Sequence, residues 1–337
     1  MKRTVCVCAL LLAIVCTAFA GGKSEGAGDG EKIVWKLSSG AAPSNAAAYA
    51  VQVFGEKIKE RTAGKITVDF YPNGQLGSDK ESISLVQMGS IVGADINTSL
   101  LSAIDPAFMI MDLPYVTTSQ QQLVEILDKG FGDYLSERLL KAAGLKITAW
   151  IVKGPRVVYN NRNSINQLSD MKGMKLRIME NPVMARSLEL LGAIPVPLPF
   201  TERVVAMQTG VVDGAENNMA VIWQEKDYEV VKYVSKTNHF NTPNTTVFDN
   251  RVLEKLPADL KKLVMDTSKE SGVIATKYDE KLNTDCEADL VRVGLQLNGI
   301  SNLQPFADAV KPVIDEYAPK IGKEAMDMFN KIKAGVK

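Results

Sequence analysis

The chain has 337 residues, of which 46% are hydrophobic and 23% charged, enough apolar material for one large core or two medium ones. Lys and Arg together number 39, as do Asp and Glu, so the formal net charge is zero. We expect no nucleic-acid binding, because that needs a surplus of positive charge to meet the phosphates. The single histidine, His239, argues against a multi-histidine metal centre and weakens any Ser-His-Asp scheme.

The first twenty residues have the pattern of a signal peptide. A short basic start precedes an apolar run from Val5 to Phe19, and Ala18-Phe19-Ala20 matches the small-x-small rule for signal peptidase. We predict that residues 1–20 are removed after Ala20, that the protein is exported to the periplasm, and that residues 21–30 form a flexible glycine-rich linker.

Cys16 leaves a second possibility open, a lipoprotein tether. The bulky Val15 stands where lipoproteins prefer a small residue, which favours plain secretion. Cleavage after Ala20 would remove three of the four cysteines and leave Cys286 without a partner for an intrachain disulfide. We expect Cys286 in the core and His239 at the surface.

The first part of the mature chain alternates strands and helices. Alternating apolar residues predict strands over 33–39, 65–71 and 94–98, with helices over 43–64 and 78–89 between them. Ser78 and Glu81 have the spacing of a capping box at the start of the second helix. Strand, helix and strand in this order predict a parallel sheet with helical crossovers, and a further helical stretch follows over 119–143.

The second part continues the alternation. Two extended segments, 146–152 and 156–160, meet at Gly154-Pro155. Beyond them we predict strands over 174–179, 193–198 and 246–248, and helices over 181–192, 201–209, 219–234, 257–297 (interrupted or bent at Gly272) and 312–332. The pattern indicates an α/β protein of two lobes, which the long helix over 257–297 could brace.

Several short motifs occur in a fixed order. They are Gly74-Gln75-Leu76-Gly77, Asp112-Leu113-Pro114-Tyr115, Gly154-Pro155-Arg156, the MKGMKLRI stretch over 171–178, Leu191-Gly192-Ala193, Pro197-Leu198-Pro199-Phe200 and the MQTGVVDGAEN stretch over 207–217. Together they resemble the solute receptors of TRAP (tripartite ATP-independent periplasmic) transporters over essentially the whole mature chain. Any one of these motifs alone would be weak.

The resemblance implies a two-lobed periplasmic-binding-protein-like α/β fold. It has mixed sheets, crossing hinge strands, a ligand in the cleft and a long helix that spans both lobes. We assign residues 31–153 plus 243–283 to lobe I and residues 154–242 plus 284–337 to lobe II. Closure of the lobes would bury the ligand and create the surface that the transporter recognises.

The resemblance also implies a carboxylate-binding arginine. Arg177 matches an Arg in the family's Lys-Leu-Arg strand that binds the ligand carboxylate, and a planar guanidinium suits that role because it makes two parallel charge-assisted bonds. The alternative is a salt-bridged surface arginine. Arg156 occupies the place of a second ligand-reaching arginine after the hinge, with a solvated hinge residue as the equal alternative.

Four further residues complete the expected site. Asn217 matches a cleft amide, although it could be a turn residue, and Phe200 matches an aromatic wall of the pocket, although most phenylalanines pack in cores. Glu180 and Asn97 follow strands, and both could instead be caps. Ligands of open α/β sheets bind at the carboxyl ends of strands, where Arg177, Glu180 and Asn97 would lie.

These residues predict a binding protein, not an enzyme, that hands a small organic acid to membrane permease subunits. No ATP site, cofactor or metal is expected. A sugar acid such as a hexuronate or aldonate is favoured, because Glu180 and Asn217 suit hydroxyls and a cleft carboxylate would repel a second ligand carboxylate. The alternatives are a C4-dicarboxylate or 2-oxo acid receptor, a sensor lobe for a signalling partner, and a secreted hydrolase or lyase with Glu180 or Glu216 as base. The last lacks a Gly-x-Ser-x-Gly elbow and a metal-ligand cluster.

Overall fold

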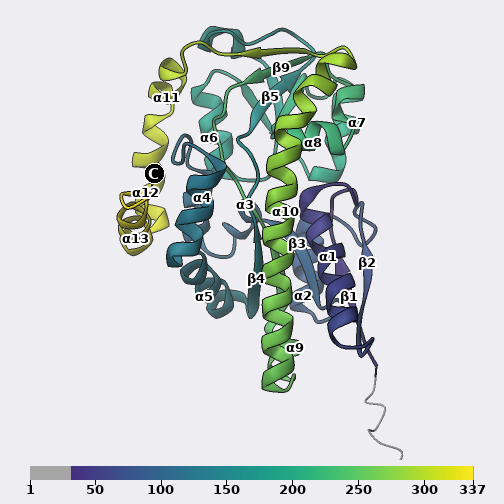
Figure 1. The fold of residues 1–337 in the computed structure, drawn as a ribbon. Coiled ribbons are helices and arrows are strands. Elements are labelled where there is room, and N and C mark those ends of the chain that lie inside the picture. The colour runs from purple at the N-terminus through teal and green to yellow at the C-terminus, as the bar shows by residue number, and fades with distance from the viewer. Residues whose placement is uncertain (1–31, 337) are drawn as a thin grey trace, which may run out of the picture. The chain divides into compact units, whose positions relative to one another are not determined.

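The computed structural model describes residues 32–336, which contain two β-sheets with helices packed on them (Figure 1). The predicted signal peptide, the linker over 21–30 and Cys16 lie outside the described residues. No helix within 32–336 combines the length and the apolar character that crossing a membrane requires. The α/β class expected from the alternation of strands and helices is confirmed.

The first sheet contains five strands, and its first three form the predicted βαβ arrangement. In spatial order the strands are β2 (Ile66–Tyr71), β1 (Ile33–Ser38), β3 (Gly93–Asn97), β10 (Asn244–Asp249) and β4 (Leu145–Ile151). β1 is parallel to β2 and β3, with α1 (Ala46–Arg61) and α2 (Asp79–Gln87) as the crossovers. β10 returns antiparallel to both β3 and β4, so the sheet is mixed.

The second sheet contains six shorter strands and is also mixed. In spatial order they are β11 (Gln296–Gly299), β9 (Tyr233–Lys236), β5 (Val157–Asn160), β8 (Gly214–Asn217), β6 (Lys175–Ile178) and β7 (Ile194–Pro197). β6 is parallel to β7 and β8, whereas β5 is antiparallel to β8 and β9.

The remaining helical elements surround these sheets. The α-helices are α3 (Thr98–Leu101), α4 (Gln120–Ile126), α5 (Gly132–Ala143), α6 (Pro182–Leu190), α7 (Arg203–Gln208), α8 (Met219–Gln224), α9 (Asn250–Glu254), α10 (Ala258–Arg292), α11 (Gln304–Ala309), α12 (Lys311–Ile321) and α13 (Lys323–Lys333). Short 3-10 or π turns are η1 (Pro106–Asp112), η2 (Leu127–Phe131), η3 (Leu168–Met171), η4 (Phe200–Glu202) and η5 (Asp227–Glu229).

The chain crosses between the sheets through two short segments. Residues 152–156 lead from β4 to β5, and residues 237–243 lead back from β9 to β10. The segments are joined to each other, because the Arg156 N–H donates to the Phe240 carbonyl at 2.9 Å and the His239 N–H donates to the Arg156 carbonyl. The exact lobe boundaries remain a prediction, and α12 and α13 pack on η1 and α4, which come from the first half of the chain.

The long helix α10 runs along both sheets. It contacts β4 and β10 of the first sheet, β11 of the second, and α8 (Figure 1). It also holds the first crossing, since its Asp279 carboxylate accepts hydrogen bonds from the Gly154 N–H at 2.9 Å and from the Asn218 side chain at 3.0 Å.

The sequence placed a bend at Gly272, but α10 is continuous. The glycine serves close packing instead. A Cβ atom at Gly272 would stand 2.6 Å from the Trp150 carbonyl oxygen and 3.0 Å from the Ala149 Cβ, both on β4. Glycine therefore lets the helix backbone approach the sheet.

Other predicted helices are shorter than expected. The helix predicted over 219–234 ends at Gln224, because Lys226 adopts a left-handed backbone with φ of 59° and the chain then forms β9. The stretches over 119–143 and 312–332 are each divided at a glycine with positive φ, Gly130 and Gly322. Residues 214–217, where a turn was one expectation, form the central strand β8.

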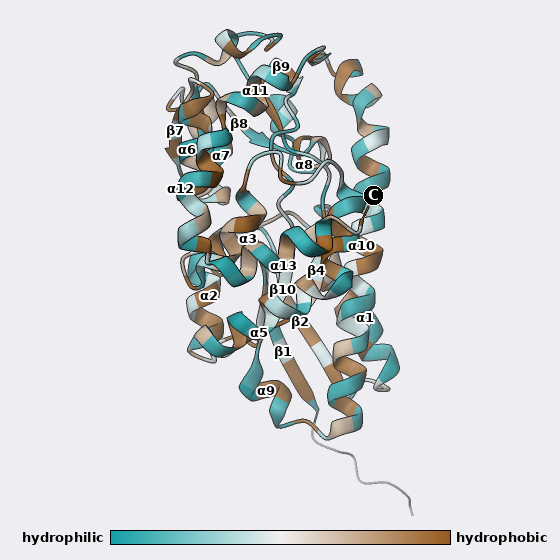
Figure 2. Ribbon diagram, turned by 90° about the vertical axis from the view of Figure 1, so that its left-hand side faces the viewer, coloured by the Kyte–Doolittle hydropathy of each residue, from teal (hydrophilic) through white to brown (hydrophobic). Residues whose placement is uncertain are grey.

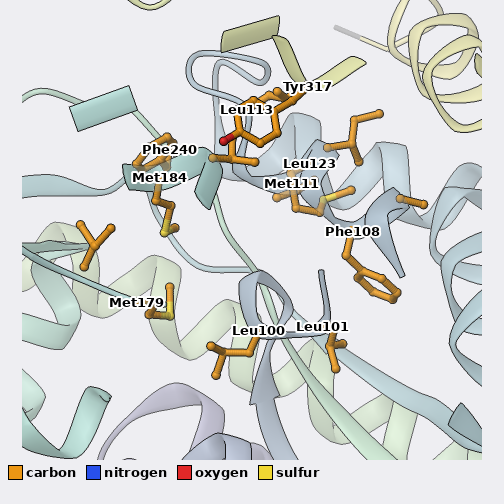
Figure 3. Packing of buried hydrophobic residues seen from close by; sticks show 14 of the residues in the cluster. Leu100, Leu101, Phe108, Met111, Leu113, Leu123, Met179, Met184, Phe240 and Tyr317 are labelled. Atoms are coloured by element: carbon orange, nitrogen blue, oxygen red, sulfur yellow. The ribbon is translucent and has the colours of Figure 1, made fainter. Parts of the chain in front are cut away.

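A large apolar core packs between these elements. Leu100 on α3, Met111 on η1, Met179 after β6 and Phe240 in the second crossing belong to one cluster, although they are far apart in the sequence (Figure 3). The helix ribbons alternate hydrophilic and hydrophobic segments along their length, as expected where one face packs on a sheet (Figure 2). Cys286 is buried in a second cluster, as expected.

Candidate functional site

The six predicted site residues line two adjoining cavities between elements of the two sheets. Arg177, Glu180 and Phe200 line the first, which we call the Arg177 cavity. Arg156, Asn97, Asn217 and Phe200 line the second, which we call the Lys153 cavity after a further lining residue. Three residues line both cavities, namely Asp79, Met179 and Phe200.

The free space in these cavities is small. It amounts to about 10 Å³ in the Arg177 cavity and about 20 Å³ in the Lys153 cavity. A cavity needs roughly 10–15 Å³ to hold one water molecule, so a six-carbon acid enters only if the walls move apart.

A larger cavity of about 350 Å³ lies between α4, α5, β4 and α10. None of the predicted site residues lines it, and most of the charged residues that do, such as Lys269 and Glu280, are exposed. We place the functional site in the smaller pair because buried charges converge there.

Arg177 is a buried cation on β6 without an ion-pair partner among the described residues. Its side chain is 1% exposed. Nε and Nη2 donate to the Leu198 carbonyl oxygen at 2.9 and 2.6 Å, whereas Nη1 has no partner in the described part of the chain. Burial, assisted by the nearby Arg203, lowers the pKa of Arg177 to about 10, so it stays charged at neutral pH. Such a group provides a free donor and an unbalanced charge for an anion.

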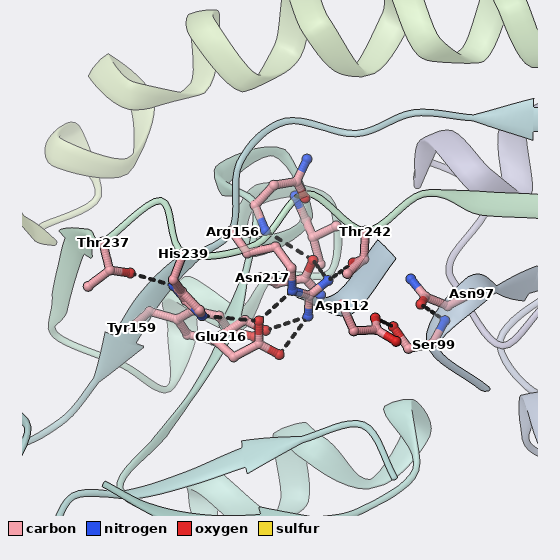
Figure 4. A network of polar contacts seen from close by, with 12 residues as sticks. Asn97, Ser99, Asp112, Arg156, Tyr159, Glu216, Asn217, Thr237, His239 and Thr242 are labelled. Carbon is pink, nitrogen blue, oxygen red and sulfur yellow. Dashed lines mark hydrogen bonds and ion pairs between the residues drawn. The ribbon is translucent and has the colours of Figure 1, made fainter. Parts of the chain in front are cut away.

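Arg156, in the first crossing, has a different environment because all of its N–H groups are used. Nε and Nη2 donate to the Glu216 carboxylate, and Nη2 also donates to the Glu216 carbonyl (Figure 4). Nη1 donates to Asn217 Oδ1 at 3.1 Å and to Thr242 Oγ1 at 3.3 Å. Burial works to raise the pKa of Glu216, but Arg156 outweighs it and holds that pKa at about 2. The structure therefore shows Arg156 as part of a buried ion pair that lines the cavity.

The two amides differ in how the protein uses them: within the described chain, Asn217 keeps one end of its amide free, whereas Asn97 caps a helix. Asn217 lies on β8, and its Oδ1 accepts from Arg156, which leaves its Nδ2 without a partner among residues 32–336. Asn97 ends β3 and caps α3, because its Oδ1 accepts from the Ser99 N–H, while its Nδ2 donates to Asn244 Oδ1 at 3.1 Å. The cap considered for Asn97 is present, and the same residue also lines the Lys153 cavity.

Glu180 contributes a charged side chain to the wall of the Arg177 cavity, and Phe200 contributes an aromatic one. Glu180 follows β6 and pairs at the rim with the Lys80 ammonium at 2.8 Å. Phe200 begins η4, and its ring is stacked by the Arg203 guanidinium at 3.7 Å from the ring centroid. Asp227 holds Arg203 in place through two hydrogen bonds of 2.9 and 3.0 Å.

Besides Lys80, three charged lining residues were missed by the sequence reasoning. Asp79 begins α2, and burial together with Asp95 raises its pKa to about 7. Burial also raises the pKa of Asp95, which lies on β3. Lys153 follows β4 and is buried. For Asp95 and Lys153, a signal was available in the sequence: a charged residue stands inside or just after an apolar strand, as in Ala94-Asp95-Ile96.

The surface position expected for His239 is wrong. The side chain is fully buried and packs against Phe240, with ring centroids 4.5 Å apart. Its Nδ1 shares a hydrogen bond of 2.8 Å with Thr237 Oγ1, and its Nε2 lies 3.6 Å from Glu216 (Figure 4). Burial lowers the pKa of His239, so the neutral form is favoured. The histidine therefore supports the second crossing and the Arg156–Glu216 pair.

Several contacts hold the rims of the cavities together. Glu225 Oε1, after α8, accepts from the Ala42 N–H at 3.0 Å and from Asn45 Nδ2 at 2.9 Å. Asn181, before α6, donates to the Ser99 carbonyl at 2.9 Å and to the Asp112 carboxylate at 2.7 Å (Asp112 and Ser99 in Figure 4). Within 32–336 no group of His, Cys, Asp and Glu side chains has the arrangement of a metal site.

Comparison with known sequences identifies related proteins. The sequence model of bacterial extracellular solute-binding protein family 7 (DctP) matches residues 37–320. The 2,3-diketo-L-gulonate-binding periplasmic protein of Escherichia coli K12 is 26% identical over 286 residues, which are 84% of this chain and 82% of that protein. The C4-dicarboxylate-binding protein of Bacillus subtilis 168 is 26% identical over 339 residues, with coverage of 96% and 97%.

Solved structures share the fold. The sugar acid binding protein of Advenella mimigardefordensis in complex with galactonate superposes with a TM-score of 0.88 at 28% identity, covering 91% of this chain and 99% of that one. A TRAP periplasmic solute binding protein of Roseobacter denitrificans with bound β-D-glucuronate gives a TM-score of 0.85 at 26% identity, with coverage of 90% and 100%.

Proposed function

Because the chain belongs to bacterial extracellular solute-binding protein family 7, we propose that it captures a sugar acid, such as a hexuronate or aldonate, and delivers it to the permease of a TRAP transporter. Membership of the family confirms the resemblance to TRAP solute receptors and to a two-lobed fold. Delivery to permease subunits is part of the proposal, as is export by a signal peptide cleaved after Ala20, with a lipid tether at Cys16 as the alternative.

The single observation that carries this proposal is the state of Arg177. A buried guanidinium with a free Nη1 and no ion-pair partner in the described chain is costly in a closed site unless an anion binds to it. A carboxylate would supply both the charge and the acceptor oxygens. We assign Arg177 as the carboxylate anchor, with Phe200 as the wall beside it.

The polar lining favours a sugar acid over a dicarboxylate. Asp95 and Asp79, in their ionised forms, would repel a second ligand carboxylate, and a pKa of about 7 leaves Asp79 partly ionised at neutral pH; the charge of Arg156 is already balanced by Glu216. Carboxylates and amides suit hydroxyl groups, which both donate and accept hydrogen bonds. The galactonate, β-D-glucuronate and 2,3-diketo-L-gulonate named for three related proteins agree with this assignment.

A C4-dicarboxylate or 2-oxo acid remains the second candidate, and the Bacillus subtilis relative favours the former. Catalysis has little support. Glu216, with its pKa held at about 2 by Arg156, is a very weak base whose two carboxylate oxygens already accept from Arg156, and Glu180 is paired with Lys80 at the rim. Incubation of the protein with a bound acid should therefore yield no turnover.

A thermal-shift panel tests the ligand class. A ligand at about 100 times its dissociation constant stabilises the fold by roughly 2.7 kcal/mol, which is readily visible as a higher melting temperature. We expect galactonate, gluconate, glucuronate and galacturonate to raise the melting temperature, and succinate, malate and fumarate to leave it unchanged. The reverse pattern, or a response to 2-oxo acids only, would contradict the sugar-acid assignment.

A further inference from the structure

We infer that Lys153 is a specificity-determining residue that donates hydrogen bonds to neutral oxygens, hydroxyl or keto, at the end of the ligand remote from its carboxylate. The inference rests on the proposed function, in which Arg177 binds that carboxylate. Lys153 is then the second cation that contacts the ligand, a role that the sequence analysis considered for Arg156.

The environment of Lys153 supports this role. The residue lies in the first crossing, two residues after β4, is 6% exposed, and lines the cavity with Asp79, Asp95 and Asn217. No side chain or carbonyl within residues 32–336 forms an ion pair or hydrogen bond with its Nζ. An ammonium has three N–H donors and no acceptor, and it is costly to bury unpaired. A ligand oxygen in the cavity would satisfy it.

Arg156 is unavailable for the same task. Its five N–H groups already donate to Glu216, Asn217 and Thr242. Freeing Nε or Nη2 for a ligand would leave part of the buried Glu216 carboxylate without a donor, and freeing Nη1 would take the donor from Asn217 Oδ1 and Thr242 Oγ1. Lys153 and Arg177 are therefore the cations with donors to spare in the two cavities, while Lys80 is bound to Glu180 at the rim.

The charges around Lys153 indicate that its partner is neutral. Burial and Arg156 lower the pKa of Lys153, whereas the carboxylates of Asp279, Asp95 and Glu225 oppose that shift. Asp79 also faces the same cavity. A second ligand carboxylate at this place would meet several negative charges at short range, which is unfavourable in a buried site. A hydroxyl avoids this repulsion.

The neighbouring acceptors complete the arrangement. Both oxygens of Asp95 are oriented by the protein, since Oδ1 accepts from Asn244 Nδ2 at 2.8 Å and Oδ2 accepts from Ser39 Oγ at 2.9 Å. The backbone N–H of Gly40 favours the ionised form of Asp79, which works against the increase in its pKa caused by burial. A row of ligand hydroxyls could accept from Lys153 and donate to these carboxylates, which a succinate-like ligand could not do.

The experiment compares Lys153→Met with Lys153→Gln by calorimetry, using galactonate as ligand and butyrate as a short acid without hydroxyls. Methionine keeps the length but has no donor, whereas glutamine keeps a neutral donor. We expect Lys153→Met to weaken galactonate binding by about 10- to 100-fold, the effect of losing a buried hydrogen bond from a charged donor. Lys153→Gln should lose less, and any weak butyrate binding should change by less than threefold. Lys323→Met, an exposed substitution on α13, is the control and should bind galactonate as wild type does.

The outcomes separate this inference from the proposed function. Failure of wild type to bind any sugar acid would overturn the proposed function itself. Galactonate binding by Lys153→Met within threefold of wild type would overturn only the role of Lys153, because the carboxylate anchor is tested separately by Arg177→Ala, which should weaken binding by about 30-fold or more. Equal losses for all acids, together with a lower melting temperature of the ligand-free variant, would indicate a structural role and also overturn the inference.

Discussion

Arg156 and Arg177 are both buried, but they differ in whether the protein satisfies their N–H groups. Arg156 donates every N–H group to neighbouring residues, while Arg177 keeps Nη1 without a partner among the described residues. The first arrangement stabilises the crossing between the sheets. The second leaves charge and donor capacity for a ligand, which is why we assign binding to Arg177 and support to Arg156.

Because Glu216 balances the charge of the buried Arg156, we predict that Glu216→Gln strongly lowers the free energy of unfolding. This isosteric change leaves Arg156 buried without its counter-charge, so the free energy of unfolding at pH 7 should fall by about 3–5 kcal/mol. The folded pKa of Glu216, about 2, lies below its ordinary value, so the wild-type contribution is present above pH ~4.5 and is lost as the pH falls toward 2. Between pH ~4.5 and pH ~2, the free energy of unfolding should therefore fall less for Glu216→Gln than for wild type.

Urea denaturation of both proteins at pH 7 and at several lower pH values measures this. Glu316→Gln, which removes an exposed partner of Arg186, is the control and should unfold almost as wild type does. An unfolding free energy for Glu216→Gln within about 1 kcal/mol of wild type at pH 7 would show that the pair does not support the crossing.

The sequence was most informative for residues that belong to motifs, although Glu180 and Asn97, predicted from their places at strand ends, also line the cavities. Arg177, Phe200 and Asn217 lie in stretches that resemble the receptor family, and all three line the cavities. Lys153 and Asp95 were missed because an isolated charge beside a strand is usually solvated. His239 was misplaced because the Glu216 and Thr237 that it meets come from a distant strand and from the crossing itself.

At the scale of elements, prediction succeeded where the local signal was complete. The capping box at Ser78 is present, with both reciprocal hydrogen bonds, and α2 begins at Asp79. The parallel β1–β2 and β1–β3 pairings follow from the alternation of strand and helix. The first two residues of β9 were included in the helix predicted over 219–234, because the apolar residues there also suit a helical period; the pairing of β9 with β5 and β11 decides the structure.

Gly272 provides a test of how α10 packs. An alanine in a helix interior normally stabilises by about 1 kcal/mol relative to glycine. At Gly272 the added Cβ would overlap the Trp150 carbonyl at 2.6 Å, and this backbone atom cannot rotate away. We expect Gly272→Ala to lower the free energy of unfolding by about 1–3 kcal/mol.

Urea denaturation at neutral pH checks this prediction. Gly299→Ala is the matched control, because a Cβ there meets no atom within 4 Å, and it should change stability little. A Gly272→Ala protein as stable as wild type or more so would mean that the helix does not approach β4 so closely in solution.

At the scale of the whole molecule, contacts across the cavities favour the enclosed state of the ligand-free protein, whereas unsatisfied charges within the cavities disfavour it. The bonds of Glu225 to Ala42 and Asn45, and of Asn181 to Ser99, hold the rims together. Enclosing Arg177 and Lys153 without a ligand has a free-energy cost, because Arg177 Nη1 is buried without a partner among the described residues and the Lys153 ammonium is largely withdrawn from water. A ligand that satisfies these donors should therefore shift the protein toward the enclosed state.

Small-angle scattering tests this shift. The crossing segments, held to α10 through Gly154 and Asp279, are the natural place for a hinge rotation. We expect a smaller radius of gyration with saturating galactonate than without ligand. An unchanged radius at saturation would indicate that the cavities rearrange locally and that the rims stay joined.

The central claim, that Arg177 binds the carboxylate of a sugar acid, is tested most directly by calorimetric titration of galactonate into wild type and Arg177→Ala. Removing one partner of a buried charge pair costs roughly 2–5 kcal/mol, so binding should weaken by about 30-fold or more, and Arg177→Lys should also lose affinity because lysine lacks the planar fork. Binding by Arg177→Ala within about threefold of wild type, which is less than 1 kcal/mol, would contradict the account.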